Sequence, residues 1–289
     1  MKIPGIRLCR FQTDGHPPRV GLLRGDSILD LAGAGVGSVT ELIGSPDVAS
    51  RVAELSGRSL PQVPIADARL LSPVDRQEVW AAGVTYLRSK SARMEESDFS
   101  ARAYNHVYDA PRPEIFFKSM PEKVVGPGDA VGIREDARWN VPEPELALVL
   151  DSRGEVAGYT IGNDMSSRDI EGENLLYLPQ AKIYERSCAI GPCVVVGVSE
   201  DEARTWKVNI RIHREGNEVF AGETDISRIR RGFRELAEWL FRSQRFPQGA
   251  ILLTGTGVVP PNEFTLEAGD VVAINISGIG TLENPVIRV

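Results

Sequence analysis

Short hydrophobic runs separated by turn-forming residues dominate the chain from residue 73 onward. Within these runs apolar side chains either alternate with polar ones or form continuous blocks, and both patterns are typical of β-strands. Glycine and proline punctuate the runs throughout, as expected for turns between strands. The pattern predicts strands at residues 146–150, 156–161, 193–198, 206–213, 218–221 and 271–276.

The first 72 residues have a different organisation and predict a small N-terminal domain. Two alternating segments flank Arg24-Gly25-Asp26, which has the composition of a hairpin turn. We therefore place a domain boundary between residues 72 and 73. The elements predicted before it are a hairpin at residues 19–23 and 27–31, helices at 39–43 and 48–55, and a strand at 68–71.

Two helices are predicted in the larger part of the chain. Residues 87–105 are strongly polar, whereas residues 227–244 carry Phe233, Leu236 and Leu240 at helical spacing. Ser227 is positioned to cap the start of the second helix. Strands and helices do not alternate regularly, so the pattern favours an α+β fold with a curved mixed sheet over a doubly wound fold.

Composition and charge exclude several classes of function. The chain has 289 residues, 42% of them hydrophobic, and a net charge of −7, which argues against nucleic-acid binding and against an anionic membrane surface as partner. No apolar run approaches the ~18 residues that a membrane-spanning helix needs. The odd count of three cysteines argues against a disulfide framework and indicates a cytoplasmic protein.

Three carboxylates provide the most informative chemistry. In the extended segment Pro142-Glu143-Pro144-Glu145, alternation places both glutamates on the same side of the chain. If residues 146–150 and 158–162 pair as antiparallel strands joined by a turn at residues 151–154, Asp164 returns beside the glutamates. Three carboxylates with no histidine nearby indicate a site for a hard cation, namely Mg²⁺, with Mn²⁺ or Ca²⁺ as alternatives. The competing interpretation is a solvated sheet edge that carries two glutamates.

Several motifs in the same order resemble the fumarylacetoacetate hydrolase family. They are Glu143-Pro144-Glu145-Leu146, the segment from Gly158 to Asp169, Ala181-Lys182, Gly191-Pro192, Thr254-Gly255-Thr256-Gly257 and the segment from Gly278 to Val286.

The resemblance implies a β-rich mixed sheet folded into a partly open barrel or roll, preceded by a small N-terminal domain. It also implies a homodimer or homotetramer that binds one divalent cation. By this resemblance Glu143, Glu145 and Asp164 are the metal ligands, and Lys182 is an active-site lysine.

Two departures from the family pattern indicate which reaction to expect. Hydrolytic members carry Gly-Leu-Asn-Tyr-x-x-His, whereas this chain reads Gly83-Val84-Thr85-Tyr86-Leu87-Arg88-Ser89, with Ser89 in place of the histidine that activates water. An additional carboxylate, Glu114, stands just before the family's Phe-x-Lys motif. Both features resemble the branch that dehydrates 2-keto-3-deoxy sugar acids of the arabinonate type to 2,5-dioxopentanoate.

The resemblance implies dehydration through a metal-stabilised enolate, with one group removing a C3 proton and another protonating the C4 hydroxyl. Glu114 and Lys182 are the candidates, and the sequence does not assign which one is the acid. The alternatives are an acylpyruvate-type C–C bond hydrolase or decarboxylase and an inactive protein that binds a 2-keto acid. Predicted contacts to the 2-keto acid substrate are Thr85, Arg88, Ser89, Gly255 and Thr256.

Overall fold

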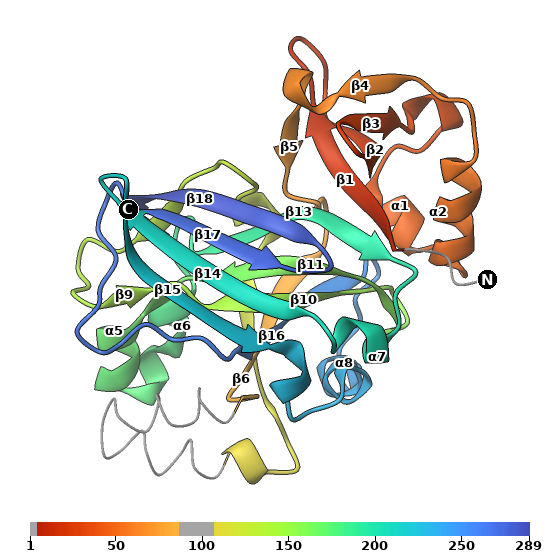
Figure 1. Cartoon of the computed structure of the whole chain (residues 1–289). Helices are drawn as coiled ribbons and strands as arrows, with labels where there is room; N and C mark the ends of the chain where they lie inside the picture. Colours follow the sequence, from red (N-terminus) through yellow and green to blue (C-terminus); the bar gives the residue numbers. More distant parts are fainter. Residues whose placement is uncertain (1–4, 87–106) are drawn as a thin grey trace.

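The computed structural model describes residues 5–86 and 107–289. The polar helix predicted at 87–105 therefore lies outside the described residues, as do the predicted substrate contacts Arg88 and Ser89. In the described ranges two large sheets and a few short helices make up the fold, which confirms the predicted α+β class (Figure 1).

The larger sheet runs through the whole molecule. Within the described residues it has 11 strands, mostly antiparallel, with β16 and β6 parallel. One of the eleven, β5 (Arg69–Leu71), pairs with β1 outside the main order of the other ten. In spatial order the sheet consists of β4 (Gln62–Pro64), β3 (Ser27–Asp30), β2 (Arg19–Arg24), β1 (Ile6–Gln12), β13 (Cys188–Val196), β11 (Val156–Asp164), β10 (Pro144–Leu150), β16 (Ala250–Thr256), β6 (Glu78–Gly83) and β7 (Glu114–Ser119).

A second sheet covers one face of the first. The two sheets are not closed into a barrel and match the predicted partly open roll. A short two-stranded ladder of β9 (Asn140–Val141) and β12 (Ser166–Ser167) completes the strands that the described residues form. The five strands of the second sheet are, in order, β15 (Asn217–Asp225), β14 (Lys207–Arg214), β17 (Val271–Ile276), β18 (Gly280–Arg288) and β8 (Val131–Ile133), the last pair being parallel.

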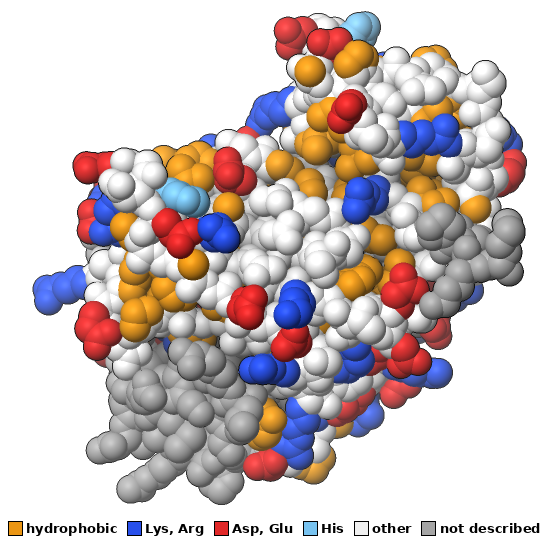
Figure 2. Space-filling model, viewed as in Figure 1, with side chains coloured by type: hydrophobic (Ala, Val, Ile, Leu, Met, Phe, Trp, Pro, Cys, Tyr) orange, Lys and Arg blue, Asp and Glu red, His pale blue; other side chains and the backbone are white. Residues whose placement is uncertain are grey.

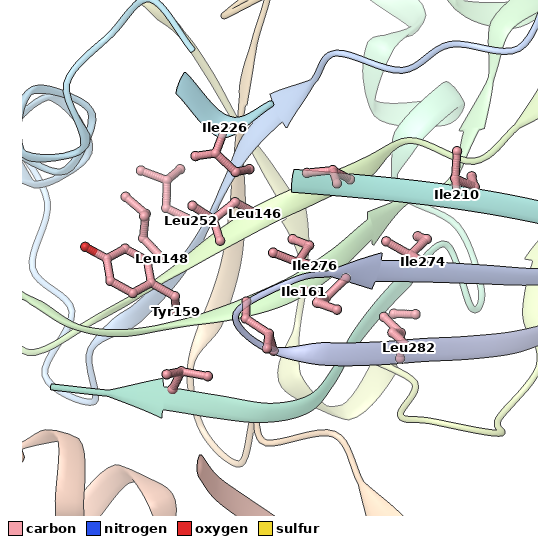
Figure 3. Packing of buried hydrophobic residues seen from close by; sticks show 14 of the residues in the cluster. Leu146, Leu148, Tyr159, Ile161, Ile210, Ile226, Leu252, Ile274, Ile276 and Leu282 are labelled. Carbon is pink, nitrogen blue, oxygen red and sulfur yellow. The ribbon is translucent and has the colours of Figure 1, made fainter. Parts of the chain in front are cut away.

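The burial of the strands follows from their hydrophobic patterns. All residues of β10 are buried, because this central strand is covered on both faces. In β14 and β17 only alternate residues are buried, since one face of the second sheet meets solvent. Figure 3 shows the resulting core between the sheets, with Leu146 and Ile161 close to Ile274 and Ile276.

The predicted N-terminal elements are present and lie at one end of the molecule (Figure 1). The hairpin of β2 and β3 forms as expected, and the two short helices match their predicted ranges closely. However, β1 pairs with β13 and so joins these strands to the larger sheet. The division into domains at residues 72 and 73 stays a prediction.

The helix predicted at residues 227–244 is shorter than expected. It begins at Phe233 with Gly232 as its N-cap and ends at Phe241, so the prediction that Ser227 caps it is wrong. The preceding segment is held extended, because the Arg204 guanidinium donates hydrogen bonds to the carbonyls of Ile229 and Arg231 at 2.9 and 2.7 Å. Backbone groups engaged in this way are not available to a helix.

The remaining described helices are short. None of the helices in the described ranges has both the length and the hydropathy needed to cross a bilayer. On the face shown in Figure 2, acidic and basic side chains are interspersed. The α-helices are α1 (Val39–Ile43), α2 (Val48–Ser56), α5 (Arg168–Glu173), α6 (Leu178–Lys182), α7 (Glu200–Ala203) and α8 (Phe233–Phe241), and the 3₁₀ turns are at Ala32–Ala34, Ile65–Asp67, Pro121–Lys123, Leu175–Tyr177 and Ile226–Arg228.

Candidate active site

Antiparallel pairing of β10 and β11 brings the three predicted carboxylates together. Their register places Pro144 opposite Asn163 and Glu145 opposite Gly162. The Asp164 amide donates to the carbonyl of Glu143 at 3.0 Å, which fixes the two residues side by side. The turn at residues 151–154 that allows this pairing is the one expected from the sequence.

The carboxylates of Glu143, Glu145 and Asp164 form one buried cluster. Each offers an oxygen, and these oxygens lie within 4.8 Å of one another. The exposed fraction of each residue is 3% or less. The cluster lines a cavity of about 10 Å³, which is the size of a site for a single water molecule or small ion. An all-oxygen, anionic donor set in a small cavity fits a hard divalent cation.

Lys182 contacts the cluster directly. Its Nζ atom lies 2.8 Å from Glu143 Oε2, 3.1 Å from Asp164 Oδ2 and 2.6 Å from the hydroxyl of Ser166. Lys182 is the last residue of α6 and is fully buried. The structure thus brings Lys182 to the three carboxylates, although they are far from it in sequence.

Two further buried cations contact the cluster, and the sequence analysis did not assign them to the site. Lys118 Nζ lies 2.5 Å from Asp164 Oδ1 and also donates to the Lys182 carbonyl at 2.5 Å. Arg168 donates to Glu143 Oε1 at 2.7 Å. Both residues occur within the motifs that carry the family resemblance, so the motifs were the available signal. Together with Lys182 they balance the charge of the three carboxylates.

Glu145 lies in a strongly perturbing environment within the cluster. Burial and the neighbouring carboxylates of Asp164 and Glu143 raise the pKa of Glu145 well above its usual value. The Gly255 amide donates to Glu145 Oε2 at 2.5 Å and partly offsets this effect. A divalent cation bound between the carboxylates would remove their mutual repulsion.

The end of β16 lies against the cluster, and its last two residues are Gly255 and Thr256. Both residues line the cavity. Gly255 has a φ of 89°, and a Cβ atom there would lie 2.2 Å from Thr85 Oγ1. Only glycine fits this close approach of the backbone. The Thr256 hydroxyl donates to the Val258 carbonyl at 3.0 Å and fixes the turn.

Thr85 occupies a supporting position next to this loop. It is buried, and its hydroxyl donates to the Thr254 carbonyl at 2.5 Å. Among the described residues, Thr85 is not one of those that line the small cavity. A direct contact between Thr85 and substrate stays a prediction.

Glu114 begins β7 beside the cavity wall. Its carboxylate lies on Gly83, which is its partner across the β6–β7 ladder. Glu114 also lines a larger neighbouring cavity of about 310 Å³, together with Arg112, Pro113, Glu171, Leu175 and Leu178. Lys118 is engaged with Asp164, and the Arg112 guanidinium lies over the Trp239 ring at 4.6 Å.

The comparison with protein families agrees with this site. The model of the fumarylacetoacetate hydrolase C-terminal domain matches residues 78–287. The chain belongs to the fumarylacetoacetate hydrolase family. This match includes every residue of the carboxylate cluster and confirms the resemblance found in the sequence motifs.

Two similar proteins within the fumarylacetoacetate hydrolase family are named as dehydratases. A probable 2-keto-3-deoxyxylonate dehydratase of Haloferax volcanii is 50% identical over 223 residues, covering 77% of this chain and 76% of the relative. The 2-dehydro-3-deoxy-D-arabinonate dehydratase of Saccharolobus solfataricus is 44% identical over 225 residues, with the same coverage of 77% and 76%.

A solved structure extends the similarity to nearly the whole chain. The complex of 2-keto-3-deoxy-D-arabinonate dehydratase with magnesium and 2,5-dioxopentanoate superposes with a TM-score of 0.82 at 35% identity. It covers 98% of this chain and 99% of that chain. The predicted resemblance to the dehydratase branch is therefore confirmed.

Proposed function

We propose that this protein is a Mg²⁺-dependent dehydratase of 2-keto-3-deoxy sugar acids, with a 2-keto-3-deoxypentonate as substrate and 2,5-dioxopentanoate as product. The observation that carries the proposal is the buried cluster of Glu143, Glu145 and Asp164 with Lys182 at 2.8 Å, in a chain 44% and 50% identical to named dehydratases. The magnesium in a similar solved structure supports the choice of cation.

The three carboxylates would hold the cation. A bound Mg²⁺ supplies Lewis acidity, which polarises the 2-keto group and makes the C3 protons acidic. Gly255 and Thr256 line the same cavity and would help to shape the space that the substrate occupies beside the cation. Arg88 and Ser89 are proposed to contact the rest of the sugar acid.

Glu114 and Lys182 are the proposed acid–base pair. One removes a C3 proton, and the other protonates the C4 hydroxyl, which leaves as water. Loss of water leaves a double bond between C3 and C4. A net transfer of two hydrogens, one from C5 and one from its hydroxyl, to C3 and C4 then gives the 5-aldehyde. Lys182 is held beside the cluster, whereas Glu114 lines the larger cavity.

Dehydration needs no activated water, which suits a chain with Ser89 in place of the family's histidine. C–C bond hydrolysis would require a base for water, and a serine does not act as one near neutral pH without help. The acylpyruvate hydrolase alternative is therefore less well supported than dehydration.

We also propose a cytoplasmic homodimer or homotetramer. Three buried free cysteines suit a reducing compartment. The oligomeric state is proposed from the family resemblance. The predicted N-terminal domain at residues 1–72 and catalytic domain at 73–289 belong to this proposal.

Product analysis tests the proposed function. The protein is incubated with Mg²⁺ and a panel of 2-keto-3-deoxypentonates, 2-keto-3-deoxyhexonates and acylpyruvates, and the products are identified by mass spectrometry. We expect loss of one water from a 2-keto-3-deoxypentonate, abolished by EDTA and restored by Mg²⁺. Efficient cleavage of acylpyruvates without loss of water from any sugar acid would contradict the proposal.

A further inference from the structure

Gly83 and Glu114 are directly paired across the β6–β7 ladder. A Cβ atom at Gly83 would lie 2.0 Å from Glu114 Oε2 and 2.7 Å from Glu114 Cδ. Real Cβ atoms do not approach other atoms so closely, so the carboxylate occupies the space in which any other residue would place its side chain. The position of the Glu114 carboxylate therefore depends on a glycine at residue 83.

Gly83 is also part of the wall of the small cavity. It lines this cavity with the three carboxylates and Lys182. Glu114 lines the larger neighbouring cavity. The Glu114 carboxylate thus lies across Gly83, between the space for a cation and the space for a larger ligand.

The chain immediately after Gly83 is held in an unusual conformation. Val84 has a φ of 52°, which is uncommon for any residue with a side chain and especially for a β-branched one. The next residue is fixed on both sides: the Thr85 hydroxyl donates to the Thr254 carbonyl at 2.5 Å, and the Arg230 amide donates to the Thr85 carbonyl at 3.1 Å. These contacts hold the end of β6, and with it Gly83, in place.

We infer that Gly83 is a positioning residue, whose missing side chain sets the place of the Glu114 carboxylate for proton transfer. This inference rests on the proposed dehydratase function, in which Glu114 is one of the two acid–base groups. Misplacement of a catalytic group by about 1 Å can cost about 10²-fold in rate. Cation binding should be retained, because Glu114 is not part of the carboxylate cluster.

The test is the variant Gly83→Ala. The atoms closest to the new methyl group are the far end of a flexible side chain, so the fold accommodates it by moving the Glu114 carboxylate. We expect kcat to fall about 10- to 100-fold, while KM changes little and calorimetry with Mg²⁺ gives the wild-type affinity. Wild-type kcat in Gly83→Ala would overturn the inference.

A double-mutant cycle with Glu114→Ala separates positioning from a general structural effect. In the Glu114→Ala background, Gly83→Ala should change kcat by less than about 2-fold, since the group that it displaces is gone. An equal loss of kcat in both backgrounds would overturn the inference. If Gly83→Ala alone does not fold, folding of the double variant supports the inference, and failure of both to fold overturns it.

A matched control comes from Gly21 in β2, far along the sheet from β7. A Cβ atom there would lie 2.3 Å from Ile28 Cγ2, so Gly21→Ala introduces similar crowding without contact with Glu114. It should lower Tm and keep the wild-type kcat. A loss of kcat in Gly21→Ala as large as that in Gly83→Ala would contradict the inference.

The cycle also remains informative if the proposed function fails. The proposed function fails if the wild-type protein releases no water from any sugar acid. The Gly83–Glu114 contact is then measured by thermal unfolding without substrate. Gly83→Ala should lower Tm, and Glu114→Ala should largely abolish this effect. A decrease in Tm that is independent of residue 114 would overturn the inference.

Discussion

Lys182 Nζ lies 2.8 Å from Glu143 Oε2, and the side chains are 0% and 4% exposed. This ion pair is buried inside the proposed metal site, where both groups have lost their hydration. The same amine contacts Asp164 at 3.1 Å, so its charge offsets the repulsion between two proposed metal ligands. Lys182 thereby serves both the electrostatics of the site and, in our proposal, its proton transfer.

The first prediction concerns the two acid–base candidates. Lys182→Met and Glu114→Gln should each lose at least about 10²-fold in kcat, because a positioned acid or base contributes about 10²–10⁴-fold. Steady-state kinetics with a 2-keto-3-deoxypentonate measure this loss, and calorimetry should show that Mg²⁺ still binds. The exposed neighbours Lys123 and Glu122 provide the controls Lys123→Met and Glu122→Gln, which should keep wild-type kcat.

A second prediction concerns the cation. Glu143→Gln, Glu145→Gln and Asp164→Asn should each weaken Mg²⁺ binding and lower kcat by orders of magnitude, since each removes an anionic oxygen from the cluster. Titration calorimetry with Mg²⁺ measures the affinity. The exposed Glu263→Gln serves as the matched control. Wild-type Mg²⁺ affinity in all three cluster variants would show that the cation binds elsewhere.

A third prediction concerns Lys118, which holds Asp164 and the Lys182 backbone. Lys118→Met removes one partner of a fully buried ion pair and leaves the Asp164 charge less compensated. The free energy of unfolding should fall by about 3–5 kcal/mol. Urea denaturation measures it, with Lys123→Met, at an exposed position, expected to stay within about 0.5 kcal/mol of wild type. Equal stability of the two variants would mean that the pair is not important for folding.

The buried thiols give a prediction on pH dependence. Burial raises the pKa of Cys188 and of Cys193 from 9.0 to about 12, and it raises the pKa of Cys9 as well. Above about pH 9 the unfolded chain releases these protons while the folded protein keeps them, so folding stability falls as pH rises.

Thermal or urea unfolding between pH 8 and 9.5 measures this fall in stability. It should amount to at most about 1.4 kcal/mol for each thiol and pH unit above 9. The variant Cys188→Ala should show a shallower dependence on pH than wild type. In native protein at pH 8, the three thiols should also react with iodoacetamide far more slowly than in urea. Identical pH profiles for wild type and Cys188→Ala would contradict this assignment.

The sequence by itself determined several central strands and the chemistry of the carboxylate cluster. Alternation and apolar runs give β14 and β17 to within one residue and most of β10 and β11, because local patterns record which face of a strand is buried. The alternation around Glu143 and Glu145, together with one short turn, was also enough to bring Asp164 beside them, since antiparallel neighbours joined by a tight turn have a predictable register.

Only the tertiary structure decided how distant segments complete the site. Lys118 on β7 and Lys182 on α6 reach Asp164 through packing between elements far apart in sequence, and no local pattern encodes those contacts. The true start of α8 at Phe233 likewise depends on hydrogen bonds from Arg204 to the preceding segment. The Glu114 carboxylate lies over Gly83 because of the register between β6 and β7. Pairing between strands decides which side chains meet, and the propensities within each strand do not determine it.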